Sequence, residues 1–171
     1  MCSSDLTEIL GPQGKPSVET VAVMRAYGLE PQFPSAVLNE ARNTVQKFDI
    51  QSIGKRVNLR KHLICTIDPP DAKDFDDAIS IERQVDKTGN QTYELGVHIA
   101  DVAHFVPLGS ELDHEAYRRG NSAYLPRKVV PMLPDILSNG ICSLQEGVDR
   151  ASKSVFIRYD SKGHIQHGRA P

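Results

Sequence analysis

Two early segments of the chain place apolar residues at helical spacing. After an irregular lead-in over residues 1–16, Ser17 is expected to cap a helix over Val18–Tyr27, and Gly28 suits its C-terminal stop. Ser35 is expected to cap a second helix, whose apolar positions follow helical periodicity. Those positions are Val37, Leu38, Ala41, Val45 and Phe48. Both segments look like packing elements, and neither contains a residue that requires a chemical role.

Further along the chain, short runs of apolar residues predict strands. His62–Ile67 predicts a short buried strand, which Pro69 stops because proline cannot donate a hydrogen bond to a neighbouring strand. Apolar residues then alternate with polar ones from Phe75 to Ile81. The turn sequence Lys87–Asn90 and the run Tyr93–Val102 complete a predicted hairpin.

The last third of the chain combines a helix, irregular segments and a second hairpin. Ser110 with an acid three residues later resembles a capping box, which opens a helix that ends at Gly120. Prolines and glycine break residues 121–147 into short pieces, with a helical turn expected near Asp135–Ser138. Ser152–Tyr159 begins a hairpin whose second strand reaches the end of the sequence. We therefore predict an α+β fold, with a mixed, mainly antiparallel sheet, flanking helices, and no helix that covers the sheet.

Composition restricts the class of protein. The 171 residues suit one ordinary domain, and 39% hydrophobic with 25% charged residues is typical of a soluble globular chain. No apolar run approaches the roughly 20 residues of a membrane span, and no secretory signal opens the chain. Three cysteines without C-x-x-C spacing argue against a disulfide framework and a zinc knuckle. We therefore expect a cytoplasmic protein with no membrane association.

An acidic cluster is the strongest chemical feature of the sequence. Of the ten residues from Asp68 to Asp77, five are aspartates, and apolar runs flank them on both sides. Carboxylates held near one another raise each other's pKa, and a hard divalent cation such as Mg²⁺ relieves that repulsion. From Asp68 to Asp101 there are nine acids against three bases, although the whole chain carries a net charge of only −2. The cluster predicts a metal site, with a solvated acidic loop as the alternative interpretation.

Other chemistries fit the sequence less well. A calcium-binding EF-hand loop needs Gly at position 6 and Glu at position 12, and a loop that begins at Asp68 has Lys73 and Ile79 there instead. The phosphate-binding G-x-x-x-x-G-K-[ST] loop, the G-x-S-x-G serine motif and a His pair at i, i+4 are all absent. What remains is an all-carboxylate site for one or two Mg²⁺ ions, whose commonest catalytic use is phosphodiester hydrolysis.

Three further features have a structural interpretation that outweighs the functional one. His98, Asp101 and His104 form a candidate metal trio, but they lie on and just after an apolar strand, where polar groups with internal partners are commoner. Cys65 is expected to fill a core position rather than act as a thiolate. The basic residues of the segment 50–61 are expected to belong to a solvated linker, with contact to phosphate as the alternative.

The acidic cluster resembles the catalytic motif of the RNase II/RNase R exoribonucleases, the RNB-domain family. Residues Thr66–Ala78 read Thr-Ile-Asp-Pro-Pro-Asp-Ala-Lys-Asp-Phe-Asp-Asp-Ala. The likeness continues in order along most of residues 18–168, and it is closer to the ribonuclease R branch than to ribonuclease II. The other matching stretches are Tyr93–Val102, Arg119–Pro126, Val130–Pro134 and Leu137–Leu144.

The resemblance implies a processive, Mg²⁺-dependent 3′→5′ exoribonuclease that hydrolyses single-stranded RNA to nucleoside 5′-monophosphates. It implies that Asp68, Asp74 and Asp77 are the main metal ligands. Asp76 would also belong to the metal site and would serve the chemical step more than RNA binding. Asp71 is not one of these four aspartates and is expected to tolerate change.

The resemblance also assigns a substrate contact. Tyr124 matches the family tyrosine that stacks on the 3′-terminal nucleotide and sets the length of the end product. Stacking on an aromatic face tolerates any base, which suits a degradative enzyme. Without the resemblance, a half-buried strand tyrosine would be the preferred interpretation. We expect a monomer whose partner is the 3′ end of single-stranded RNA, with no small-molecule cofactor.

The chain departs from the family by its length. The family's catalytic domain is roughly twice as long as the part after residue 50, and a later catalytic arginine, a second aromatic clamp and an S1 domain have no counterpart. Residues 1–16 would be a lead-in with a remnant cold-shock strand near Leu6–Leu10, 17–61 a helical linker region, and 62–171 the N-terminal half of an RNB catalytic domain. Such a fragment is expected to be inactive alone. A non-catalytic RNA-binding module and a calcium-binding structural domain remain as alternatives.

Overall fold

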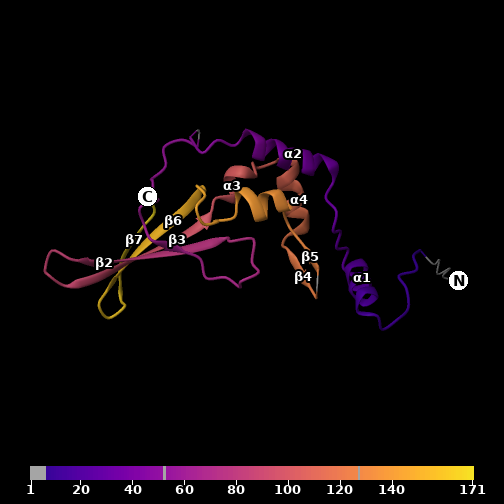
Figure 1. Ribbon diagram of the computed structural model, residues 1–171, viewed down its shortest axis with the longest axis horizontal. Helices are drawn as coiled ribbons and strands as arrows, with labels where there is room; N and C mark the ends of the chain where they lie inside the picture. The colour runs from indigo at the N-terminus through magenta and orange to yellow at the C-terminus, as the bar shows by residue number, and fades with distance from the viewer. Residues whose placement is uncertain (1–6, 52, 127) are drawn as a thin grey trace.

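The computed structural model describes residues 7–51, 53–126 and 128–171. A five-stranded antiparallel sheet in the order β1-β2-β3-β6-β7 carries a cluster of helices at one end (Figure 1). The sheet strands are β1 (Ile64–Cys65), β2 (Asp77–Val85), β3 (Gln91–Ala100), β6 (Ser152–Asp160) and β7 (Ile165–Arg169). The helices are α1 (Pro16–Ala26), α2 (Ser35–Lys47), α3 (Val102–Phe105), α4 (Glu111–Arg119) and the π-helix η1 (Leu137–Ile141), and a small hairpin joins β4 (Ala123–Leu125) to β5 (Lys128–Val130). The predicted fold class is therefore confirmed.

Helices α1, α2 and α4 occur where the sequence predicts them, whereas the short helix α3 was not predicted and two of the predicted caps are wrong. Helix α1 begins at Pro16, one residue before Ser17. Proline suits this position because a backbone N–H in the first turn of a helix has no hydrogen-bond partner within the helix, so its absence costs nothing. Pro34 occupies the N-cap of α2, and no side chain caps that helix, so Ser35 lies inside it. The stop at Gly28 is confirmed, since this residue adopts a φ of 63° just beyond α1.

The third predicted cap is present in α4. The Ser110 hydroxyl accepts a hydrogen bond from the Asp113 backbone N–H at 3.2 Å, and Gly120 ends the helix with a φ of 75°. The Asp113 carboxylate accepts a hydrogen bond from the Gly109 N–H rather than from the Ser110 N–H, so this half of the capping box is displaced by one residue. Arg119, in the last turn of α4, lies 3.8 Å above the ring centre of Phe33, which ties α4 to the segment before α2.

The hydrophobic core lies where the helices meet the end of β3 and the start of β6. Its buried members come from α2, α3, α4, η1 and the two strand ends. They are Val37, Ala41, Ala100, Phe105, Leu112, Leu137, Ile141, Cys142 and Ala151. Helix α1 lies beyond this cluster, away from the sheet (Figure 1). In the described part of the chain, no helix is long and apolar enough to cross a bilayer.

The two predicted hairpins are confirmed, and the first predicted strand is corrected. Strand β2 pairs with β3, and β6 pairs with β7. The strand expected over His62–Ile67 is reduced to Ile64–Cys65, and both residues are exposed. Within the described residues, this strand lies at the edge of the sheet and pairs with β2 alone, so no described strand covers its other side. The expectation that Cys65 fills a core position is therefore wrong.

Residues 7–10 form neither helix nor strand, whereas Leu6 lies outside the described residues. The cold-shock strand expected near Leu6–Leu10 is thus not formed over the part that the structure describes.

One face of the sheet carries apolar side chains that remain in contact with water. Ile81 is 64% exposed, Val85 is 70% exposed, and Ile99 and Val155 are each 46% exposed. The strand register places these residues on the same face. The helices gather at the end of the sheet rather than over this face (Figure 1).

The opposite face buries polar groups that bond to one another. His98 Nε2 lies 3.0 Å from the Ser80 hydroxyl, and His98 Nδ1 lies 2.9 Å from the Ser154 hydroxyl. Burial first, and the nearby His62 second, lower the pKa of His98. Gly96 lies against this pair, because a Cβ there would be 2.4 Å from Ser80 Oγ and 2.8 Å from His98 Nε2.

We expect Gly96→Ala to destabilise the fold by about 1–3 kcal/mol, because the added methyl group must displace a buried, hydrogen-bonded hydroxyl. Urea unfolding of the variant would measure this as a lower midpoint. Gly168→Ala is the matched control in β7, since the nearest atom to its Cβ is 3.8 Å away. Equal midpoints for the two variants would contradict the prediction.

Candidate functional site

The aspartate cluster lies on the loop between β1 and β2. Asp68, Asp74 and Asp76 precede the strand, and Asp77 is the first residue of β2. The alternation predicted from Phe75 therefore becomes regular strand only at Asp77, where pairing with β3 begins, so Asp74 and Asp76 lie before the strand.

Backbone hydrogen bonds from distant segments hold the C-terminal half of this loop. The Leu144 N–H, just after η1, donates to the Phe75 carbonyl at 2.9 Å, and the Ala100 N–H donates to the Asp76 carbonyl at 2.9 Å. The loop is thus attached both to the end of β3 and to the chain that leaves η1. These hydrogen bonds fix the position of the backbone from which the Asp74 and Asp76 side chains extend, even though neither residue lies in a helix or strand.

The four aspartates lie close enough to act on one another electrostatically. Burial raises the pKa of Asp76, and the negative charges of Asp74, Asp77 and Asp68, in that order, raise it further. Asp68 Oδ2 is buried and has no hydrogen-bond partner among the described residues. A buried carboxylate oxygen without a donor is unfavourable unless a cation or a proton approaches it.

These features fit a hard divalent cation, although the carboxylates are not assembled around one point. Nowhere in residues 7–51, 53–126 and 128–171 do three His, Cys, Asp or Glu side chains come together closely enough to hold one metal ion. Asp76 and Asp77 both keep surface in contact with solvent, although the carboxyl group of Asp76 is partly desolvated. An all-oxygen donor set with mutual repulsion and one unpartnered buried oxygen is suited to Mg²⁺.

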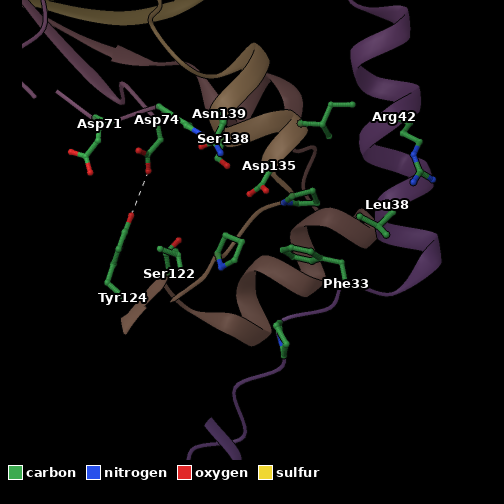
Figure 2. Close-up of a pocket in the computed structure, with 17 residues that line it drawn as sticks. Phe33, Leu38, Arg42, Asp71, Asp74, Ser122, Tyr124, Asp135, Ser138 and Asn139 are labelled. Carbon is green, nitrogen blue, oxygen red and sulfur yellow. Dashed lines mark hydrogen bonds between the residues drawn. The ribbon is translucent and has the colours of Figure 1, made fainter. Parts of the chain in front are cut away.

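A cleft of about 640 Å³ opens beside Asp74. Asp74 and Tyr124 lie at one end, and Arg42 of α2 lies at the other (Figure 2). The polar and charged residues of its wall are Arg42, Asp71, Lys73, Asp74, Ser122, Tyr124, Asp135, Ser138 and Asn139. The size is in the range of clefts that hold a small ligand or one unit of a polymer.

Tyr124 presents its ring to solvent at the mouth of this cleft. It is 70% exposed in the β4-β5 hairpin, so the interpretation as a half-buried strand tyrosine is wrong. Its hydroxyl donates to Asp74 Oδ2 at 3.5 Å, as the dashed line in Figure 2 shows. Burial of the hydroxyl, followed by the charges of Asp74 and Asp76, raises the pKa of Tyr124. The phenol therefore remains protonated and able to donate beside the carboxylates.

The cleft also contains residues that the sequence did not single out. Ser122, Asp135, Ser138 and Asn139 line its wall between Tyr124 and Arg42. Two of the stretches with family likeness, Arg119–Pro126 and Leu137–Leu144, contain three of these four residues. The family likeness of these two stretches could be seen in the sequence. Which of their residues line the cleft depends on how η1 packs beside the aspartate loop.

The candidate trio His98, Asp101 and His104 has structural partners. Both ring nitrogens of His98 face serine hydroxyls. Asp101 is buried and forms an ion pair with Arg56 at 2.7 Å. His104 packs edge-on against Phe105, with the ring centres 5.0 Å apart. These contacts support the structural interpretation for His98 and for one oxygen of Asp101, whereas the other oxygen of Asp101 has no hydrogen-bond partner among the described residues and His104 is exposed.

Two basic residues of the segment 50–61 also have partners within the chain. Besides the ion pair of Arg56 with Asp101, Arg60 Nε donates to Asp149 at 2.8 Å. These contacts favour a structural role over contact with phosphate for the two arginines.

Comparisons with known proteins give a consistent result. The family model described as the RNB domain matches residues 56–170. Ribonuclease R of Thermotoga maritima is 47% identical over 162 residues, which is 94% of this chain and 22% of the relative, and ribonuclease R of Chlamydia muridarum is 42% identical over 164 residues, 96% and 23% of the two chains.

Solved structures agree with the sequence comparison. Mycoplasma genitalium RNase R in complex with ribose-methylated single-stranded RNA superimposes with a TM-score of 0.83 at 34% identity, over 96% of this chain and 25% of that one. The complex of the same protein with double-stranded RNA gives a TM-score of 0.82 at 34% identity, over 96% and 28%. The chain thus spans about a quarter of the length of the relatives that it matches.

We expect Asp76→Asn to stabilise the metal-free protein at pH 7. The folded state raises the pKa of Asp76 above its ordinary 3.8, so the ionised form is unfavourable in the fold at neutral pH. The gain should diminish as the pH falls through the raised pKa, because the wild-type carboxyl is then protonated as well. Thermal unfolding in EDTA across this pH range measures the effect. Glu146→Gln, an exposed acid outside the cluster, is the control, and an Asp76→Asn variant no more stable than wild type would count against the prediction.

Proposed function

Because the chain belongs to the RNB-domain family, we propose that its aspartate cluster serves a 3′→5′ exoribonuclease. The observation that carries the proposal is the raised pKa of Asp76, caused by burial and by Asp74, Asp77 and Asp68, beside a cleft that exposes an aromatic ring. Such a concentration of negative charge is unfavourable in a site built only for structure, and it is useful where cations must be held.

Each aspartate has a proposed role. Asp68, Asp74 and Asp77 hold the divalent cation, and Asp76 contributes to the same site and to the chemical step. A bound Mg²⁺ would activate water and stabilise the charge that develops on the leaving oxygen. Asp68 contributes its buried Oδ2, which has no hydrogen-bond donor among the described residues. Asp74 accepts a hydrogen bond from the Tyr124 hydroxyl.

The proposed substrate is the 3′ end of single-stranded RNA, degraded processively to nucleoside 5′-monophosphates. The exposed ring of Tyr124 is a stacking platform for the terminal base, and stacking accepts every base. The solved relative with single-stranded RNA bound supports this choice of substrate. We further propose that residues 62–171 act as the N-terminal half of the catalytic domain, behind a helical linker over 17–61 and a lead-in over 1–16, in a monomeric cytoplasmic protein.

One observation favours a second candidate, a non-catalytic RNA-binding module. Among the described residues, no three acidic or histidine side chains are assembled at a single point. A protein of this kind would shift RNA in a gel without Mg²⁺-dependent hydrolysis, and the same assays distinguish the two functions.

In the natural full-length protein, Asp76→Asn should lower the rate of RNA hydrolysis at least about 100-fold, the scale expected when one electrostatic group of an active site is removed. The affinity for RNA, measured by gel shift in EDTA, should change little. Asp71→Asn is the comparison, since Asp71 is outside the proposed ligand set and should retain hydrolysis. Strong residual activity in the Asp76→Asn variant would contradict the proposed role.

Tyr124→Ala should change the length of the oligonucleotide that remains at the end of the reaction, because the terminal base loses its stacking surface, a contact that contributes about 1–3 kcal/mol per base. Sequencing gels of the limit products measure the change. Tyr117→Ala removes another exposed tyrosine from α4, outside the cleft, and should leave the products unaltered. Identical products from wild type and Tyr124→Ala would remove the assignment.

A further inference from the structure

We propose that Ser143 is a positioning residue, which fixes the backbone on both sides of Asp74 and thereby sets the affinity of the aspartate cluster for a divalent cation. The inference rests on the proposed function, because it assumes that Asp74 serves as a metal ligand. It concerns a residue that lies outside the aspartate motif and that makes no contact with RNA in the proposal above.

The Ser143 side chain is fully buried and uses its hydroxyl group twice. Its Oγ accepts a hydrogen bond from the Phe75 N–H at 3.1 Å and donates to the Lys73 carbonyl at 2.8 Å. A serine hydroxyl offers one donor and acceptor lone pairs, and both functions are used here. The two bonds reach the residues immediately before and after Asp74, so they hold the Asp74 Cα from both sides.

Neighbouring bonds make Ser143 part of a rigid attachment. The Leu144 N–H donates to the Phe75 carbonyl at 2.9 Å, which adds a third bond to the same short segment. The Ser143 carbonyl in turn accepts from Arg150 Nε at 2.9 Å, and Arg150 Nη2 lies 3.3 Å from Gln145 Oε1. The backbone of Ser143 is therefore bonded to the segment after η1, while its side chain is bonded to the aspartate loop.

This attachment opposes a specific force. Four like-charged carboxylates, Asp68, Asp74, Asp76 and Asp77, lie within ten residues of one loop and its junction with β2, so they repel one another. A loop outside a regular element would move apart under that repulsion. Without the hydroxyl, the Phe75 N–H and the Lys73 carbonyl, which form partly buried hydrogen bonds with it, lose their partner, and the segment can shift toward another. Groups that orient metal ligands commonly change metal affinity or activity about 10- to 100-fold when they are removed.

The test uses two substitutions at Ser143 and one matched control in the natural full-length protein. Ser143→Ala removes both hydrogen bonds, and Ser143→Cys keeps the shape of the side chain, with a somewhat larger sulfur atom, while it replaces the hydroxyl with a weak donor and acceptor. Ser110→Ala removes a comparable bond from a serine hydroxyl to a backbone N–H, at the start of α4 and outside the aspartate loop. It controls for a general loss of stability.

Three measurements separate positioning from stability. Hydrogen–deuterium exchange of the Phe75 amide without metal reports the attachment itself. Binding of Mn²⁺, followed by the electron paramagnetic resonance signal of the free ion, reports the aspartates without any reaction. The Mg²⁺ concentration at half-maximal RNA hydrolysis, with RNA affinity measured in EDTA, reports the consequence for activity.

The expected result for Ser143→Ala is faster exchange at Phe75, Mn²⁺ affinity weakened about 10-fold or more, a matching rise in the Mg²⁺ requirement, and unchanged RNA affinity. Ser143→Cys should fall between Ser143→Ala and wild type, and Ser110→Ala should match wild type in all three measurements. Exchange and Mn²⁺ affinity in Ser143→Ala equal to those of Ser110→Ala would overturn the inference. A wild-type protein that binds Mn²⁺ at the cluster but does not hydrolyse RNA would overturn the proposed function instead, since the first two measurements need no turnover.

Discussion

Mutual repulsion among carboxylates, restrained by hydrogen bonds from distant parts of the chain, is the constraint on which this structure depends. Asp74 and Asp76 lie on a loop that no strand or helix contains, and the backbone at Phe75 and Asp76 is held by Leu144 and Ala100. Burial of Asp76, followed by the negative charges of Asp74, Asp77 and Asp68, raises the pKa of its carboxyl group. A fold that tolerates this arrangement sacrifices stability at one place to keep a concentrated negative charge there.

The remainder of the fold supports that loop from two directions. The sheet supplies the end of β3, whose register with β2 begins at Asp77, and the helical cluster supplies η1 and the segment after it. These two bodies share one core, in which Ala100 and Ala151 of the strand ends pack with Leu137 and Ile141 of η1. The small side chains of the strand ends let the π-helix approach the sheet, and this brings residues 143–144 within hydrogen-bonding distance of the loop.

The sequence predicted local features well and long-range ones poorly. The two sheet hairpins and the cap at Ser110 follow from periodicity and turn residues close together in the chain, and they are confirmed. The caps at Ser17 and Ser35 failed, because a proline lies immediately before each serine and takes the earlier helical or capping position. Burial of Cys65 failed because alternation does not reveal that a strand lies at an edge. The approach of Asp68, Asp74, Asp76 and Asp77 was predicted, since all four lie within ten residues of the chain. The wall of the cleft, by contrast, depends on contacts between distant residues.

The open face of the sheet has a consequence for how the chain behaves in water. Ile81, Ile99 and Val155 expose apolar side chains to water on one face of the sheet. The net charge of −2 provides little repulsion between copies of the chain. Attraction between such surfaces weakens on cooling, because the release of hydration water provides most of its free energy near room temperature. Contact between this face and another apolar surface is therefore favoured more strongly at room temperature than in the cold.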